Sequence, residues 1–240
     1  MACYIPGTKE QAEKDSDASK FCDWRYFDGL KDSRGYPDGE YDFRKGYGIM
    51  MWHDRYLETA RRLAKRFAPV YTFLELGCAK GFLPQAFRMQ GIDAMGLDIS
   101  EYAIEHCHPE MEPHLFLQNA SDLSNFPNNK FDLIYSWDFM EHLKPEDVLS
   151  CLKENKRIGK RYINHNITVF DRDYGAICSH FPDEPQDPTH VSCYTRLWWE
   201  DIFASAFSEK EIQKVEYIGK PFQTGSKRRG MLEVAIKVSD

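Results

Sequence analysis

Between residues 70 and 170 the chain alternates short apolar runs with stretches whose hydrophobic positions repeat at helical spacing. The apolar runs cover 70–76, 92–98, 115–118, 131–137 and 161–170. Apolar positions three and four residues apart predict helices over about 83–90, 100–107 and 146–155. Strands that alternate with helices indicate βαβ units, so we expect an α/β protein with a parallel sheet covered on both faces.

The flanking segments extend this pattern. An amphipathic helix is predicted over 49–67, and a helix near 197–207 followed by strands near 209–218 and 231–237 ends the chain. Residues 21–47 mix aromatic residues with Asp, Gly and Arg without a regular period, and we interpret them as an ordered cap. We therefore divide the chain into a tail and cap, 1–48, and one sheet domain, 49–240, with a substrate loop at about 171–195.

Composition narrows the possible classes of protein. The 240 residues carry a formal net charge of −7, and 42% are hydrophobic, which is enough for a large core. This acidic balance argues against broad nucleic-acid binding, which needs a basic surface. The chain has no apolar run of membrane-span length, and its seven cysteines form no C-x-x-C pair, which is typical of reduced thiols. We expect a cytoplasmic protein that does not contact membranes and whose partner is a small molecule.

The segment FLELGCAKG, residues 73–81, is the most informative stretch of the chain. A buried strand stops at Gly77, small residues occupy positions 77, 79 and 81, and a helix follows, so the backbone can approach a ligand at a helix N-terminus. Asp98 ends the next predicted strand, where a carboxylate can accept hydrogen bonds from both hydroxyls of a ribose. The pattern therefore predicts a nucleoside-containing cofactor.

Four motifs carry a resemblance to a known family. LELGCAKG, GLDIS, QNASDL and KFDLIYSWDFMEHL, within about residues 70–150, resemble the class I S-adenosylmethionine (SAM) dependent methyltransferases, and the pattern is closest to bacterial small-molecule and sugar methyltransferases. The resemblance implies a Rossmann-like, seven-stranded, mostly parallel sheet with a reversed last strand, and SAM as the cofactor. A nicotinamide cofactor is the competing reading, and the absence of G-x-G-x-x-G disfavours it.

The resemblance also implies roles for individual residues. The methionine and sugar part of SAM would lie against Gly77, Ala79 and Gly81, with Glu75 beneath the amino group and Asp98 on the ribose. Ile99 would cover the adenine, Asn119 and Ala120 would meet the adenine edge, and Trp137 would contact the methionine portion. Ala79 departs from the family pattern, which has glycine there, and we expect its methyl group to fit at a negative φ.

Two histidines are candidates for the general base, because an imidazole titrates near neutral pH. His142 follows Glu141 after the fourth strand, and His190 lies in DPTHVSCYTRLWW, which resembles a segment near the acceptor site of bacterial sugar and natural-product methyltransferases. Purely structural roles are the alternative for both: His142 as a helix-stabilising residue, and His190 as a loop residue bonded to backbone.

A metal site is a further hypothesis. Asp138, Glu141, His142 and His190 offer carboxylate and imidazole groups that suit Mg²⁺, Mn²⁺ or Fe²⁺. D-x-x-E-H resembles the metal-binding pattern of small-RNA 2′-O-methyltransferases, although those enzymes have Glu where this chain has Asp138. We do not favour a divalent metal, because an RNA substrate agrees poorly with the net charge of −7.

We therefore expect SAM-dependent O-methylation of a sugar or nucleotide-linked metabolite, with His190, His142 and Asp138 as the catalytic residues. Three alternatives stay open: small-molecule N-methylation, metal-assisted RNA 2′-O-methylation, and a catalytically silent SAM-binding subunit. The sequence does not identify the acceptor, the metal status or the oligomeric state.

Overall fold

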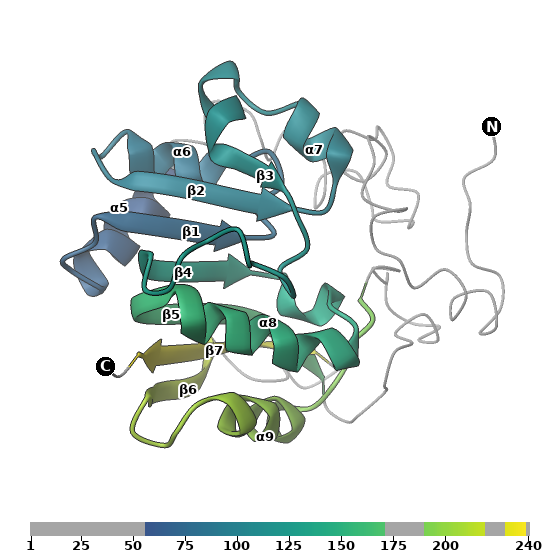
Figure 1. Ribbon diagram of the computed structural model, residues 1–240. Helices are drawn as coiled ribbons and strands as arrows, with labels where there is room; N and C mark the ends of the chain where they lie inside the picture. The colour runs from purple at the N-terminus through teal and green to yellow at the C-terminus, as the bar shows by residue number, and fades with distance from the viewer. Residues whose placement is uncertain (1–55, 171–189, 219–228, 239–240) are drawn as a thin grey trace, which may run out of the picture.

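Seven strands form one sheet with helices on both faces (Figure 1). This computed structural model describes residues 56–170, 190–218 and 229–238. The predicted cap, within 1–48, and the part of the predicted substrate loop at 171–189 lie outside the described residues.

The sequence pattern anticipated the strands and α-helices of the described residues. The strands are β1 (Thr72–Leu76), β2 (Asp93–Asp98), β3 (Leu115–Leu117), β4 (Phe131–Trp137), β5 (Gly159–Phe170), β6 (Ile212–Ile218) and β7 (Arg229–Lys237). The α-helices are α5 (Glu58–Arg66), α6 (Phe82–Arg88), α7 (Glu101–Glu105), α8 (Pro145–Ile158) and α9 (Arg196–Ala206). Sequence reasoning missed the 3₁₀ helices η3 (Pro109–His114) and η4 (Met140–His142), because such short elements establish no hydrophobic period.

The sheet order is β3-β2-β1-β4-β5-β7-β6. Strands β1 to β5 run parallel to one another, whereas β7 runs antiparallel to both β5 and β6. In Figure 1 the arrowheads of β1, β2 and β4 therefore point to one edge and that of β7 to the opposite edge. This topology confirms the predicted seven-stranded, mostly parallel sheet with a reversed last strand. The loops that follow β1 to β5 gather at a single edge, which is where α/β proteins place their ligands.

Two hydrophobic clusters hold the helices on the sheet. On the face covered by α8 and α9, Trp199 and Phe203 are fully buried against Ile134 of β4. On the face covered by α5 and α6, Phe73 of β1 stacks on Phe87 of α6 with ring centroids 3.8 Å apart. Part of the aromatic content therefore packs the core.

Two further expectations concern membrane contact and the thiols. Within the described part of the chain, no helix combines the length and the apolar character needed to cross a membrane.

Cys78, Cys107 and Cys151 are free thiols, but Cys193 is disulfide-bonded, with its partner outside the described residues. The prediction of reduced thiols is therefore wrong for Cys193.

Candidate functional site

The turn between β1 and α6 has a left-handed backbone at each of the three small residues that the sequence singled out. The φ angles are 68° at Gly77, 48° at Ala79 and 74° at Gly81. The expectation of a negative φ at Ala79 is wrong. An L-residue in this conformation is disfavoured by about 1–2 kcal/mol, so the surrounding structure must hold Ala79 in place.

Packing explains why two of these positions are glycine. A Cβ atom at Gly77 would overlap the ring of Phe139, and one at Gly81 would lie 2.6 Å from a Leu115 methyl carbon. Sequence reasoning attributed the small residues to the approach of a ligand. In the structure Phe139 and Leu115 already require them, and Phe139 thereby joins the loop after β4 to the turn after β1.

Asp98, at the end of β2, connects this turn to the second strand. Its Oδ2 accepts a hydrogen bond from the backbone N–H of Ala79 at 2.8 Å, and its Oδ1 accepts one from Ser100 at 2.9 Å. The carboxylate is 9% exposed. Since a carboxylate oxygen can accept more than one bond, Asp98 keeps acceptor capacity for a ligand while it holds Ala79 in its left-handed conformation.

Glu75 and Asp98 place negative charge at the same edge of the sheet. Burial, followed by the neighbouring Asp98, raises the pKa of Glu75 well above its usual range. Burial also raises the pKa of Asp98, although the N–H groups of Ser100 and Ala79 and the nearby His142 act in the opposite direction. Neither carboxylate forms an ion pair with a described residue. Two buried, mutually repelling carboxylates favour a cationic ligand.

The predicted adenine-edge residues lie in the loop after β3. Asn119 Oδ1 accepts hydrogen bonds from the backbone N–H and hydroxyl of Ser121, at 2.9 and 3.0 Å. Ala120 is buried, and Ile99, after β2, is half-buried. Asn119 and Ala120 follow β3, which pairs with β2, so they lie on the same side of the site as Asp98.

Trp137 and Asp138 end β4 on the other side of the turn. Trp137 is 44% exposed, and its Nε1 donates to Asp138 Oδ2 at 3.1 Å. Asp138 has a φ of 47° and accepts a second bond at Oδ1 from the Thr168 hydroxyl at 2.9 Å. Asp138 therefore fixes the orientation of an exposed indole.

Glu141, in η4, joins this edge to the segment that carries His190. Its Oε1 accepts from the Thr168 backbone N–H at 3.1 Å, and its carbonyl oxygen accepts from the N–H groups of Val191 and Ser192 at 3.0 and 2.9 Å. Sequence reasoning missed Thr168 and Ser192. A hydroxyl near the carboxyl end of a buried apolar strand was the signal for Thr168, whereas nothing in the sequence indicated Ser192.

The two candidate bases lie side by side. The rings of His142 and His190 meet edge to face with centroids 4.6 Å apart, and a ligand atom from each lies within 4.8 Å of the other and of a Glu141 oxygen. Glu141 is fully buried, and its Oε2 has no hydrogen-bond partner among the described residues. Burial and the nearby Asp138 raise the pKa of Glu141. Of the four residues predicted for a metal, Asp138 is not part of this group.

Comparison with known proteins agrees with this geometry. Residues 74–161 match a family model described as a methyltransferase domain. A ubiquinone biosynthesis O-methyltransferase of Methylococcus capsulatus is 27% identical over 121 residues, which make up 48% of this chain and 48% of that protein. The chain thus matches about half the length of this curated relative.

Solved structures share the fold. A SAM-dependent methyltransferase from Archaeoglobus fulgidus superposes with a TM-score of 0.59 at 18% identity, covering 81% of this chain and 96% of that one. The PH0226 protein from Pyrococcus horikoshii gives 0.60 at 16% identity, covering 90% and 98%. The N-terminal domain of EvdMO1, crystallised in the presence of SAH and D-fucose, gives 0.59 at 17% identity, covering 78% and 84%. At these identities the likeness shows the fold.

Proposed function

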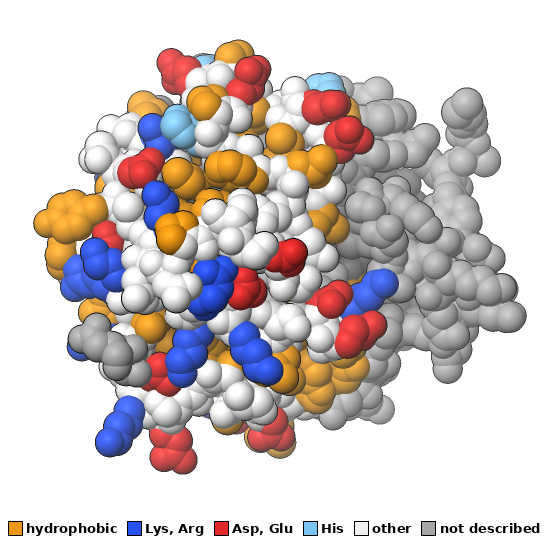
Figure 2. Space-filling model, in the orientation of Figure 1, with side chains coloured by type: hydrophobic (Ala, Val, Ile, Leu, Met, Phe, Trp, Pro, Cys, Tyr) orange, Lys and Arg blue, Asp and Glu red, His pale blue; other side chains and the backbone are white. Residues whose placement is uncertain are grey.

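We propose that the protein transfers a methyl group from SAM to a small-molecule acceptor. The match of residues 74–161 to a family model described as a methyltransferase domain supports this proposal. The acceptor atom is an oxygen of a sugar or a nucleotide-linked metabolite. The O-methyltransferase among the relatives supports oxygen over nitrogen. On the face shown in Figure 2, Lys and Arg are interspersed with Asp and Glu, which supports a small acceptor over RNA.

The observation that carries this proposal is the buried acidic pair of Glu75 and Asp98 beside the left-handed turn. SAM supplies an electrophilic methyl group on a positively charged sulfonium and also carries an ammonium group. Both charges would relieve the repulsion between the two carboxylates. A nicotinamide dinucleotide would instead bring a pyrophosphate to this acidic site, so the pair supports SAM over that competing cofactor.

The cofactor roles proposed for single residues are consistent with this chemistry. Asp98 accepts hydrogen bonds from the ribose hydroxyls, and Glu75 faces the ammonium group. Asn119 and Ala120 meet the adenine edge, Ile99 covers the adenine ring, and Trp137 contacts the methionine portion. Gly77, Ala79 and Gly81 form the turn beneath the methionine and sugar.

On the acceptor side the protein has to align a hydroxyl with the methyl group and remove its proton. His190 or His142 accepts this proton while the oxygen–carbon bond forms and the carbon–sulfur bonding pair stays on sulfur. His142 and His190 are in edge-to-face contact. An acceptor hydroxyl beside one imidazole would therefore also be near the other, so this contact supports either histidine as the base. Asp138 contributes by positioning Trp137 rather than by proton transfer.

A metal-assisted transfer is the second candidate, because one buried oxygen, Glu141 Oε2, has no hydrogen-bond partner. This carboxylate and the two imidazoles, His142 and His190, match the mixed O and N ligands of Mn²⁺ or Fe²⁺. Such an ion would supply Lewis-acid activation of the acceptor hydroxyl. The two candidates assign different roles to the imidazoles: proton acceptor in one, ligand in the other.

Calorimetry with SAM and with its demethylated product tests the main proposal. We expect a micromolar dissociation constant for both, and a screen of hydroxylated metabolites with radiolabelled SAM should then identify the acceptor. Absence of binding at millimolar SAM contradicts every enzymatic version. SAM binding without turnover on hydroxyl or amine acceptors would favour the catalytically silent subunit.

The metal candidate has a readout that does not depend on turnover. Chelator-treated protein is titrated with Mn²⁺ and followed by electron paramagnetic resonance. Glu141→Gln keeps an acceptor for the Thr168 N–H but removes the negative ligand, so it should abolish Mn²⁺ binding. A wild type that binds no Mn²⁺ and keeps full activity after chelation excludes the metal and leaves an imidazole base.

A further inference from the structure

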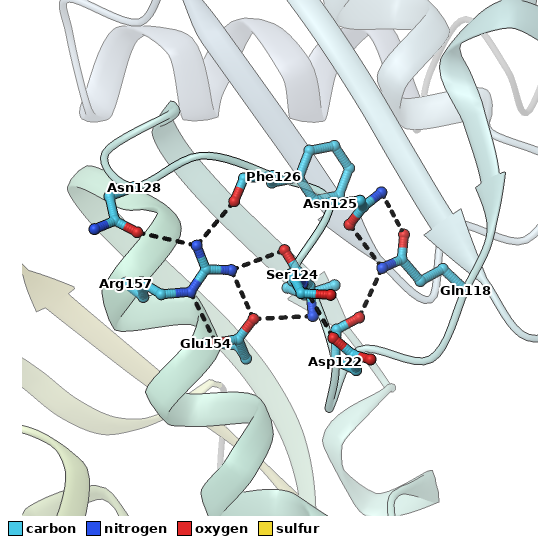
Figure 3. Close-up of polar contacts among 9 residues, drawn as sticks. Gln118, Asp122, Ser124, Asn125, Phe126, Asn128, Glu154 and Arg157 are labelled. Carbon is cyan, nitrogen blue, oxygen red and sulfur yellow. Dashed lines mark hydrogen bonds and ion pairs between the residues drawn. The ribbon is translucent and has the colours of Figure 1, made fainter.

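Arg157, in the last turn of α8, uses its whole guanidinium to hold the loop between β3 and β4 (Figure 3). Its five N–H groups donate at 2.7–3.0 Å to Glu154 Oε1, Glu154 Oε2, the carbonyl oxygens of Leu123 and Phe126, and Asn128 Oδ1. A guanidinium has five such donors in a rigid planar fork. Every donor is therefore satisfied, and three of the five bonds go to the loop.

Backbone and carboxylate contacts reinforce this attachment. Glu154 Oε2 accepts from the Leu123 backbone N–H at 2.9 Å, and the Arg157 carbonyl accepts from the Asn129 N–H at 3.0 Å. The Leu123 side chain is fully buried, and that of Phe126 is 7% exposed. Polar contacts to α8 and apolar contacts to the core therefore hold residues 123–129 in place.

A second set of bonds ties the same loop to the end of β3. Gln118 Nε2 donates to the Asp122 carbonyl at 2.6 Å, and Gln118 and Asn125 exchange amide hydrogen bonds at 2.8 and 2.9 Å. Asp122 Oδ1 also accepts from the Ser124 N–H at 3.1 Å. Residues 119–122, which include the predicted adenine contacts Asn119 and Ala120, thus lie between two anchored points, β3 and the segment that Arg157 holds (Figure 3).

We propose that Arg157 is a positioning residue for recognition of the adenine base. By holding 123–128 on α8 it fixes residues 119–122 in one conformation, so that their polar groups are preorganised for the adenine edge. The inference rests on the proposed function, and it adds a residue with which neither the cofactor nor the acceptor is proposed to make contact. Its consequence is selectivity: a loosened loop loses discrimination between adenine and a base with a different edge.

The test compares two ligands that differ only at that edge, S-adenosylhomocysteine and its deaminated form, S-inosylhomocysteine. Deamination turns the N6 donor of adenine into an acceptor and the N1 acceptor into a donor, so a preorganised edge should reject it strongly. In Arg157→Met we expect the dissociation constant of S-adenosylhomocysteine to rise about tenfold, that of S-inosylhomocysteine to change less than twofold, and the acceptor KM to stay as in the wild type.

Arg88→Met is the matched control. Arg88 also lies in the last turn of a helix and bonds an acid and a carbonyl, Asp93 and Ala94, and its side chain is 31% exposed against 29% for Arg157. It lies in α6, on the opposite face of the sheet from α8, and its bonds go to the start of β2 and not to the loop that Arg157 holds, so its loss should leave both dissociation constants unchanged. If Arg157→Met does not fold, Glu154→Gln takes its place, since it weakens the ion pair and keeps an acceptor for Leu123.

Equal weakening of both ligands, or unchanged binding of both, overturns the positioning role. Arg157→Lys sharpens the result, because an ammonium keeps the charge but cannot reproduce the planar fork, and it should behave like Arg157→Met. Full selectivity in Arg157→Lys would also contradict the proposal. A wild type that binds neither ligand refutes the proposed function instead, so the two failures are distinguishable.

Discussion

Two regions of the site differ in how their polar groups are satisfied. The adenosine side comprises Asp98 and the loop between β3 and β4 with Arg157, and the acceptor side comprises Asp138, Glu141, His142, Thr168 and His190. On the adenosine side, Arg157 satisfies all its donors and Gln118 and Asn125 pair reciprocally. On the acceptor side, the fully buried Glu141 has one oxygen without a partner. The loop behind the proposed adenine contacts is thus complete within the described chain, whereas Glu141 keeps one acceptor without a described partner.

This difference suggests that one region serves cofactor binding and the other serves methyl transfer. A buried polar atom without a partner is costly, so a ligand, a proton or an ion that completes Glu141 Oε2 would be bound favourably. Residues that only hold a common cofactor can satisfy one another in advance, whereas those that face a reacting group must keep capacity for it. We infer that variants of the adenosine side change cofactor affinity, and that variants of the acceptor side change turnover.

The largest effect is expected for Asp98→Ala, which removes the acceptor proposed for both ribose hydroxyls. It also frees the N–H groups of Ala79 and Ser100. Since a hydrogen bond to a charged group contributes about 1.5–3 kcal/mol, we expect SAM affinity to fall at least about 100-fold by calorimetry. Near-normal affinity would refute the ribose assignment.

Asp93→Ala is the control for that variant, because Asp93 lies at the other end of the same strand. Its carboxylate is 49% exposed and pairs with Arg88. Thermal unfolding of both variants separates loss of a ligand contact from loss of the fold. SAM affinity in Asp93→Ala should equal that of the wild type; a comparable loss there would mean that β2 as a whole, and not the Asp98 carboxylate, supports binding.

The next effect belongs to the acceptor side. Thr168→Val removes the hydroxyl bonded to Asp138 but keeps the backbone N–H bonded to Glu141. Asp138 then holds the Trp137 indole less firmly, so we expect kcat to fall about tenfold. Because Trp137 is proposed to contact the methionine portion of SAM, the SAM dissociation constant should rise as well, but by a smaller factor. Thr168→Ser, which restores the hydroxyl, should recover most of kcat. A loss of SAM affinity that matches the loss of kcat would place Thr168 on the cofactor side.

Sequence reasoning predicted local features better than contacts between distant segments, for a physical reason. Hydrophobic periodicity and local turns are written in neighbouring residues, so the order of strands and helices, the turn at Gly77–Gly81 and the acid at the end of β2 were predictable. Contacts between distant segments were not. The bond from Thr168 to Asp138 spans 30 residues and the bond from Arg157 to Phe126 spans 31, and neither leaves a local pattern.

Ala79 shows the same limit at a single residue. Its left-handed φ depends on a hydrogen bond to Asp98, 19 residues away. The motif indicated that a small residue belongs at this position, but the conformation of that residue is set by a partner outside the motif. The grouping of His142 with His190 was likewise open in the sequence, because it depends on how Glu141 docks Val191 and Ser192.

The pH dependence of cofactor binding is a smaller and more specific effect. The pKa of Glu75 is raised in the folded protein by burial and by Asp98, so Glu75 favours folding fully below its unfolded pKa of about 4.3 and this contribution is lost as pH rises through the folded value. A cationic ligand prefers the ionised carboxylate. SAM affinity should therefore rise as the pH increases above the usual titration range of a glutamate carboxyl, and Glu75→Gln should flatten this slope. A slope unchanged in Glu75→Gln would exclude Glu75 as its source.

The smallest effect is expected for Ala79→Gly. Glycine adopts a φ of 48° without the strain of a Cβ atom, but it also gains freedom in the unfolded chain. The two terms oppose each other, so the free energy of unfolding should change by less than about 1 kcal/mol, as denaturant titration can measure. SAM affinity should change less than twofold, because the backbone N–H that Asp98 accepts remains. A large loss of affinity would mean that the Ala79 methyl group itself contacts the cofactor, and the adenosine side would then depend on a side chain that the family pattern replaces with hydrogen.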